Sequence, residues 1–119
     1  STNQLTELDV THNALLTKLT CNRNQLTQLS TDNNFMLDEL NCNDNQLTNL
    51  NLKSDTRLTN LQCEQNQLST LNLSQNILLR VVKCSNNNIR ELDLTNNTAL
   101  MKLSCDNSVN VIGFNESEK

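Results

Sequence analysis

From residue 58 to residue 68 the chain reads LTNLQCEQNQL, with Leu58, Leu61 and Leu68 placed around Cys63 and Asn66. This pattern returns every 21 residues, and the cysteines keep the spacing without a slip over four consecutive intervals: Cys21, Cys42, Cys63, Cys84 and Cys105. A fixed period of this length is typical of a solenoid, in which each repeat forms one coil and the coils stack.

Aligning the chain on itself at 21 residues gives columns of apolar residues on both sides of the cysteines. One column lies two residues before each cysteine: Leu19, Leu40, Leu61, Val82 and Leu103. Four others begin at Leu5, Leu8, Val10 and Leu16, and the third of these is interrupted by Thr31. Apolar residues two apart, as in Leu61-Gln62-Cys63, predict a half-buried strand, and stacked coils about 4.8 Å apart would bury a continuous core.

Asparagine forms two further columns. Their members are Asn3, Asn24, Asn45, Asn66 and Asn87, and then Asn13, Asn34, Asp55, Asn76 and Asn97. Asparagine tolerates left-handed backbone geometry, and its amide bonds to the backbone groups of turns. Because the chain has no proline and only one glycine, Gly113, we expect these columns to carry most of the turning and to satisfy buried peptide groups.

Composition favours one small solenoid domain, over residues 1–114, followed by a polar tail at 115–119. The net charge is −4 and the basic residues are scattered, which argues against nucleic-acid binding. No apolar run approaches the roughly 20 residues of a membrane span, so membrane insertion is not expected. The first residues contain neither a basic start nor an apolar stretch, so we expect no signal peptide within the chain.

The quoted stretch resembles the signature L-x-x-L-x-L-x-x-N-x-L of the leucine-rich repeat family, with Cys63 in the third leucine place. Equivalent segments begin at Leu16, Leu37, Leu79 and, with weaker agreement, Leu100. One cysteine per 21-residue coil is similar to the internalin type of bacterial surface protein, whose repeats stack a cysteine ladder. The resemblance implies a right-handed coil of about five repeats. It also implies one parallel β-strand per repeat on the concave face, little or no α-helix, and a secreted or cell-surface location.

The two halves of each repeat are nearly alike, so the position of the strand needs an argument. Asn66 has its next leucine two residues on, as the signature demands, whereas Asn76 waits three. We therefore predict the strand on the cysteine half. After Cys105 the period breaks, and Val109, Ile112 and Phe114 fit a further half-coil if one residue is deleted.

The five cysteines allow three interpretations. Zinc ligation fails because the cysteines are not closely paired and His12 is the only histidine. A disulfide framework is disfavoured by the odd number of cysteines and by the torsion that a disulfide requires. We expect buried free thiols that pack as compact apolar side chains, forming a structural ladder.

No catalytic residues, metal site or cofactor are predicted. His12 occupies a loop position where the other repeats have polar residues, and the carboxylates lie in variable surface columns. Function is then expected in the outward positions of the strands, since repeat proteins keep the core fixed and vary what faces out. The candidate partner-binding residues are Lys18, Thr20, Glu39, Asn41, Asn60, Gln62, Glu64, Lys83, Lys102 and Ser104.

These residues are small and mixed in charge, and they suit a modest polar interface with a protein or glycan at a host or bacterial surface, in adhesion or host-factor binding. A second hypothesis starts from the ends of the solenoid, where no polar cap is recognisable. Exposed apolar end coils would favour a homo-oligomer, such as a dimer, with a structural role.

Overall fold

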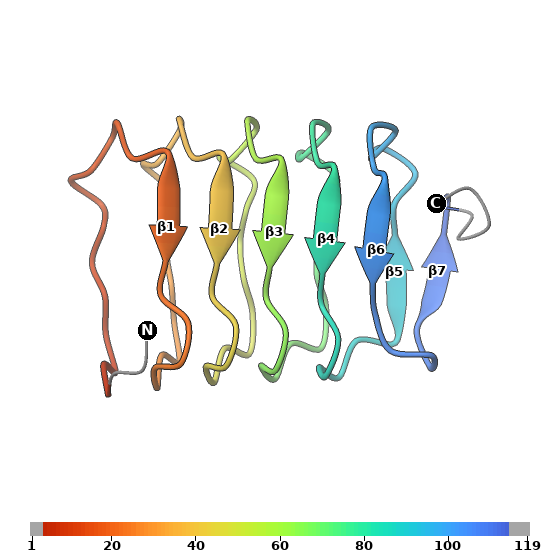
Figure 1. Cartoon of the computed structure of the whole chain (residues 1–119), viewed down its shortest axis with the longest axis horizontal. Helices are drawn as coiled ribbons and strands as arrows, with labels where there is room; N and C mark the ends of the chain where they lie inside the picture. The colour runs from red at the N-terminus through yellow and green to blue at the C-terminus, as the bar shows by residue number, and fades with distance from the viewer. Residues whose placement is uncertain (1–3, 115–119) are drawn as a thin grey trace.

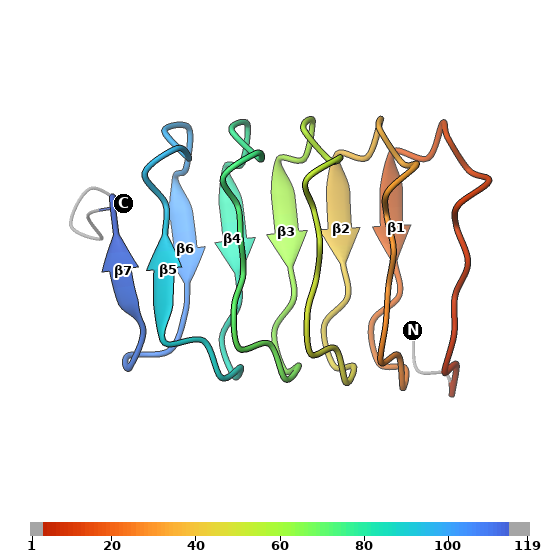
Figure 2. The ribbon, with the colours of Figure 1, turned by 180° about the vertical axis from the view of Figure 1, so that it is seen from behind.

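The computed structural model describes residues 4–114; Asn3 and the tail predicted at 115–119 lie outside the described residues. The chain forms a solenoid in which it runs down one side, returns up the opposite side and advances by one coil each time (Figures 1 and 2). This path is the right-handed coil that the resemblance to leucine-rich repeats implies. The described residues contain seven short strands and no helix.

Five of the strands form one parallel sheet on what we call the strand side. They are β1 (Lys18–Thr20), β2 (Glu39–Asn41), β3 (Asn60–Gln62), β4 (Val81–Lys83) and β6 (Lys102–Ser104). Each residue pairs with the residue one period later, as Leu40 pairs with Leu61. Each of these five strands ends directly before a cysteine, so the prediction that the cysteine half supplies the main strand is confirmed. We call the opposite side, formed by the other half of each repeat, the leucine side.

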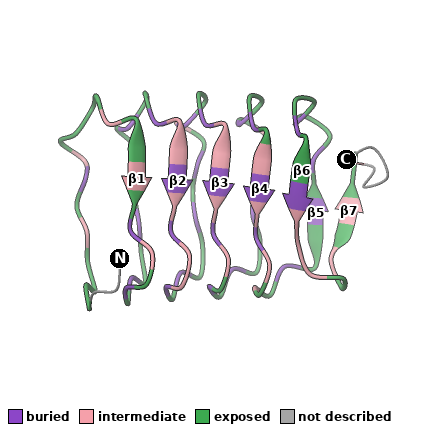
Figure 3. Cartoon of the chain, in the orientation of Figure 1, coloured by how far each residue is buried: buried purple, intermediate pink, exposed green. Residues whose placement is uncertain are grey.

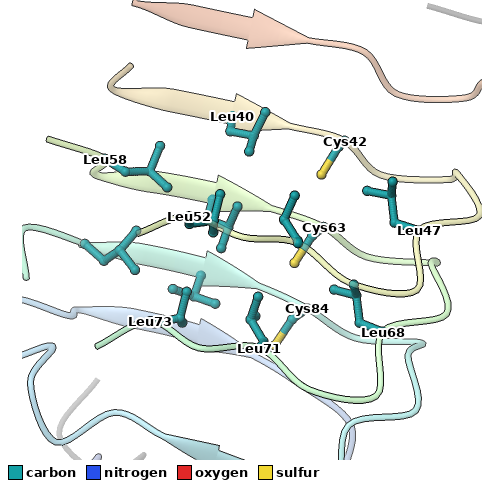
Figure 4. Close-up of a cluster of buried hydrophobic side chains, with 14 of the residues drawn as sticks. Leu40, Cys42, Leu47, Leu52, Leu58, Cys63, Leu68, Leu71, Leu73 and Cys84 are labelled. Carbon is teal, nitrogen blue, oxygen red and sulfur yellow. The ribbon is translucent and has the colours of Figure 1, made fainter. Parts of the chain in front are cut away.

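The core is a narrow stack of leucine and cysteine side chains between the two sides (Figure 4). In β2, β3 and β4 the middle residue is buried and its two neighbours are half-buried, which is the alternation expected of a strand with one face on the core. Leu71 and Leu73 close the core from the leucine side. Buried residues recur at the same places in successive coils (Figure 3), so each coil covers the apolar edge of its neighbour.

The first asparagine column ties each coil to the one before it. Asn66 Nδ2 donates to the carbonyl oxygens of Cys42 at 3.0 Å and Cys63 at 3.2 Å. Its Oδ1 accepts a hydrogen bond from the backbone N–H of Leu47 at 3.1 Å. Asn45 and Asn87 make the same set of bonds one coil earlier and one coil later. The column therefore satisfies buried peptide groups, as the sequence predicts.

The expectation that asparagine also supplies the left-handed geometry is wrong for these columns. The left-handed residue of each coil is the one just before the asparagine: Arg23, Asp44, Gln65 and Asn86, with φ between 56° and 61°. The ladder asparagines need their side chains directed inward to reach two carbonyls, and the residue before each of them takes the left-handed backbone conformation instead. Only one of these four positions holds asparagine.

The second asparagine column fastens the turns that lead from the leucine side into the strands. Asn76 Nδ2 donates to the carbonyl oxygens of Leu52 and Asp55, both at 2.9 Å, and Asn97 repeats the bonds one coil later. Asp55 stands in this column and has no amide to donate. Instead Thr31 Oγ1, from the preceding coil, donates to Asp55 Oδ2 at 2.5 Å, and both residues are fully buried. The two departures from the repeat pattern, at Thr31 and Asp55, thus compensate each other.

A further half-coil follows the last repeat, as predicted, but its register differs from the prediction. On the leucine side β5 (Glu91–Asp93) pairs in parallel with β7 (Asn110–Ile112), and Leu92 lies opposite Val111. Deleting one residue after Cys105 would have placed Ile112 there. A one-residue slip turns side chains to the other face, and Ile112 is accordingly exposed.

Gly113 lets the end of this half-coil approach Thr95. Its φ is +83°, and a Cβ at this position would lie 2.7 Å from the Thr95 backbone. Both the left-handed geometry and the close approach require glycine.

Candidate interaction surfaces

The strand-side residues predicted to bind a partner form two parallel rows along the solenoid. One row contains Lys18, Glu39, Asn60, Val81 and Lys102, and the other contains Thr20, Asn41, Gln62, Lys83 and Ser104, each in register with the next. Glu64 follows β3 and is half-buried. The structure thus brings all ten predicted residues to one side of the molecule, and seven of them are half-buried there.

Several of these side chains are already held by polar contacts. Lys18 Nζ and Glu39 Oε2 form an ion pair at 3.3 Å between the first two coils. Asn43 Nδ2 donates to Gln62 Oε1 at 3.4 Å, and the backbone N–H of Glu64 donates to Asn43 Oδ1 at 2.6 Å. These bonds reduce side-chain freedom before any partner binds, which lowers the entropic cost of forming an interface.

The cysteine ladder lies directly behind this surface and is not part of it. Cys21, Cys42, Cys63 and Cys84 are buried, Cys105 is half-buried, and all five thiols are free. Burial raises the pKa of Cys21 to about 11 and that of Cys84 to about 12, and it also raises the pKa of Cys63 well above its ordinary value. These thiols therefore stay protonated at neutral pH, which leaves them without the thiolate that nucleophilic or metal-binding cysteines need.

A second surface, which sequence reasoning missed, lies along the edge where the turns lead into the strands. We call it the turn ridge, and it is made of exposed apolar side chains at equivalent turn tips: Leu15, Phe35, Met36, Ile77 and Leu78. Leu15 is 83% exposed, Phe35 55% and Ile77 53%. The sequence carries a signal for this surface. The turn positions equivalent to Phe35 and Met36 are exposed in every repeat, yet three of the repeats have large apolar residues there.

The leucine side offers shallow polar hollows rather than a deep pocket. One is lined by Thr70, Asn72, Glu91, Asp93 and Thr95, and Thr95 fixes the Asp93 carboxylate with hydrogen bonds from its hydroxyl and its N–H. These hydrogen bonds lower the pKa of Asp93. Within residues 4–114 no group of three or more His, Cys, Asp or Glu side chains could hold a metal ion. In the same range there is no helix with the length and apolar character needed to cross a membrane.

No protein-family model and no curated protein matches the chain. Solved structures do match. The functional domain of InlJ from Listeria monocytogenes, described as including a cysteine ladder, superposes with a TM-score of 0.87 and 36% identity over 89% of this chain. An internalin, InlF, from the same organism superposes with a TM-score of 0.78 over 96% of the chain, and at 23% identity this likeness concerns the fold.

The chain spans only part of these relatives, 24% of the InlJ structure and 39% of the InlF structure. What it shares with both is the solenoid fold, and the cysteine ladder that the InlJ structure is described as including is present in this chain as well, one cysteine per 21-residue coil. The chain is therefore a leucine-rich repeat protein with 21-residue cysteine-ladder repeats, similar to the internalin InlJ.

Proposed function

We propose that the chain is a non-catalytic protein-interaction module that acts in adhesion or host-factor binding at a bacterial surface, with the strand side as its main contact surface. One observation carries the proposal: the interior positions repeat from coil to coil, while the in-register rows of the strand side do not. Repeat proteins bind partners through surface positions that vary in this way. The likeness to the InlJ functional domain supports both the module and the bacterial surface.

The charge pattern of the strand side suits a polar protein interface. Lys83 and Glu64 lie near its centre, and both are half-buried, so a partner that covers them would desolvate charged groups. Truncating or reversing such a group costs more than changing a charge at the rim of an interface. The binding energy is therefore expected to depend on these two residues.

The test uses the whole chain, immobilised, to capture proteins from extracts of host-cell surfaces. The variants Lys83→Glu and Glu64→Lys should lose the captured protein, while Lys53→Glu, an exposed charge on the leucine side, should retain it. Unchanged circular dichroism would show that each variant is folded. Retention by both strand-side variants would refute the assignment of this surface, and capture only of a glycan on a glycan array would replace the protein partner by a sugar.

Self-association is a second candidate function. β1 and β6 are the outer strands of the five-stranded sheet, and outer strands offer backbone groups for pairing with another chain. Leu5, at one end of the described solenoid, is 43% exposed, and such apolar end surface favours stacking of copies. Light scattering over a wide concentration range tests this idea, and a strict monomer throughout would exclude it.

A further inference from the structure

The turn ridge differs from the strand side in kind, because it contains the residue types that dominate binding energy. Phe35, Met36, Ile77 and Leu78 are large and apolar, and each is more than one third exposed. Between them, at the matching turn of the third coil, stands Arg57. Aromatic residues, methionine and arginine are enriched at protein interfaces, and aromatic residues and arginine are common among the few residues that contribute most of the binding energy.

The ridge is held rigid by the backbone. Each turn is closed by a hydrogen bond, as from Leu37 N–H to the carbonyl of Asn34 at 3.1 Å. The second asparagine column joins one turn to the next, through Asn34 Nδ2 to the carbonyl of Asn13 at 3.0 Å. A rigid apolar surface loses little conformational entropy on binding.

Arg57 defines the charge that the ridge needs. The guanidinium of Arg57 contacts Met36, with Nη1 3.5 Å from Sδ. Among residues 4–114 an ion pair forms between Lys18 and Glu39 and does not involve Arg57. The described structure therefore gives Arg57 no carboxylate. An exposed cation flanked on both sides by apolar side chains is complementary to an anion flanked by apolar side chains.

The spacing of the coils selects the shape of the partner. Parallel strands lie about 4.8 Å apart, so the apolar turns of the second and fourth coils are about 10 Å apart, with Arg57 midway. An α-helix rises about 5.4 Å per turn, so residues i and i+7 on one face are also about 10 Å apart, with i+3 and i+4 between them. Leu15, one coil earlier, falls near position i−4.

We propose that the turn ridge binds an amphipathic helix of a partner protein, with apolar residues at i and i+7 and Asp or Glu at i+3 or i+4 opposite Arg57. The proposal rests on the protein-binding function above and adds a second surface and the chemistry of its ligand. A second copy of the chain is a poorer occupant, because symmetric pairing of two ridges brings Arg57 toward Arg57. An anionic lipid surface is also poorer, because the chain carries a net charge of −4.

The test is a yeast-display selection with the folded chain as bait. The library is an alanine-rich helix, capped at both ends, with positions i, i+3, i+4 and i+7 randomised. The wild type should enrich apolar residues at i and i+7 and Asp or Glu between them. The variant Arg57→Glu should enrich Lys or Arg at the same position, and Phe35→Ser with Ile77→Ser should weaken binding of the selected helices about tenfold or more.

Lys53→Glu is the matched control, because it reverses an exposed charge in the same coil on the leucine side, and it should leave binding unchanged. Circular dichroism checks that the variants are folded. Enrichment of no helix, or a charge preference that does not follow residue 57, would overturn the proposal. Loss of concentration-dependent association in Phe35→Ser would assign the ridge to a second copy, and loss of sedimentation with phosphatidylserine vesicles would assign it to lipid.

Failure here is separable from failure of the strand-side assignment. Lys83→Glu and Glu64→Lys should not alter helix binding. If only these two variants lose the captured host protein and no helix is selected, the strand-side assignment is supported and the turn-ridge proposal is refuted. If helices are selected and no host protein is captured, the turn-ridge proposal is supported and the strand-side assignment is refuted.

Discussion

Replacing Asp55 by Asn should remove a large part of the pH dependence of stability between pH 4 and pH 7. Asp55 is fully buried at a position where Asn76 and Asn97 each donate two hydrogen bonds to carbonyl oxygens. An ionised carboxylate cannot donate, and its Oδ1 has no partner among the described residues. Burial raises the pKa of Asp55 from 3.8 to about 6, the hydrogen bond from Thr31 opposes the rise, and the nearby Asp32 adds to it.

The magnitude follows from the difference between these pKa values. About two units at 1.36 kcal/mol per unit correspond to about 3 kcal/mol. Because the folded state binds the proton more tightly than the unfolded state, this stability is fully present below pH 3.8 and is lost as the pH rises through about 6. At pH 7 the wild type therefore lacks about 3 kcal/mol that it has in acid.

The assay is urea unfolding, followed by far-ultraviolet circular dichroism, at several pH values from 3.5 to 7.5. Relative to D55N, the free energy of unfolding of the wild type should fall by about 3 kcal/mol over this range, so that D55N is the more stable protein at pH 7. Exposed carboxylates such as Asp9 and Asp93 titrate alike in both proteins and cancel in the comparison. Parallel curves for the two proteins, or a pKa of Asp55 below 4 by NMR, would refute the reasoning.

The remaining predictions concern the ladder, the left-handed turns and the end of the solenoid. Cys63→Leu should destabilise the chain by about 1–3 kcal/mol through overpacking in a slot sized for a thiol, and more than Cys63→Ala does, as measured by urea unfolding. The four buried thiols of the folded chain, those of Cys21, Cys42, Cys63 and Cys84, should react slowly with a thiol reagent at pH 8, because burial raises the pKa of Cys21 to about 11, and all five thiols should react in denaturant; fast reaction of these four in the folded chain would contradict the ladder. Gln65→Gly should stabilise the chain by about 0.5 kcal/mol, because the strain of a left-handed backbone that glycine relieves exceeds the entropy that glycine costs on folding. Gln67→Gly should destabilise the chain, because the backbone of Gln67 is not left-handed and only the entropic cost applies. Gly113→Ala should loosen the final half-coil, and faster hydrogen exchange at the Leu94 and Asn110 amides would be the sign of it; unchanged exchange would show that the contact with Thr95 yields without cost.

The period made most of the fold predictable. A fixed spacing can be satisfied only if each coil repeats the contacts of the last, so the register of Leu40 with Leu61 follows from the period. The choice of the cysteine half for the strands followed instead from the repeat signature, which requires a leucine two residues after the asparagine. The asparagine bonds follow for the same reason, because an inward amide at the same place in every coil meets the same carbonyls.

What the period does not contain was predicted poorly or not at all. Arg23, Asp44 and Gln65 have no residue type in common, so composition gave no sign that their backbone is left-handed. The slip at Val111 could not be read because, once the period breaks, apolar residues alone cannot distinguish a deletion of one residue from a deletion of two. The turn ridge could not be found from the period, because its large apolar residues do not recur in every repeat and so form no column.

The asparagine bonds also give the solenoid a direction. Asn45 accepts a hydrogen bond from the N–H of Leu26 and donates one to the carbonyl of Cys21, and both of these groups belong to the preceding coil. A coil that has just left the ribosome or a membrane pore is therefore incomplete until the asparagine of the next coil arrives. We expect the chain to become ordered about one repeat behind its emerging end. During a pause in synthesis or export, the newest coil would then be sensitive to proteases, while the earlier coils are already folded and protected.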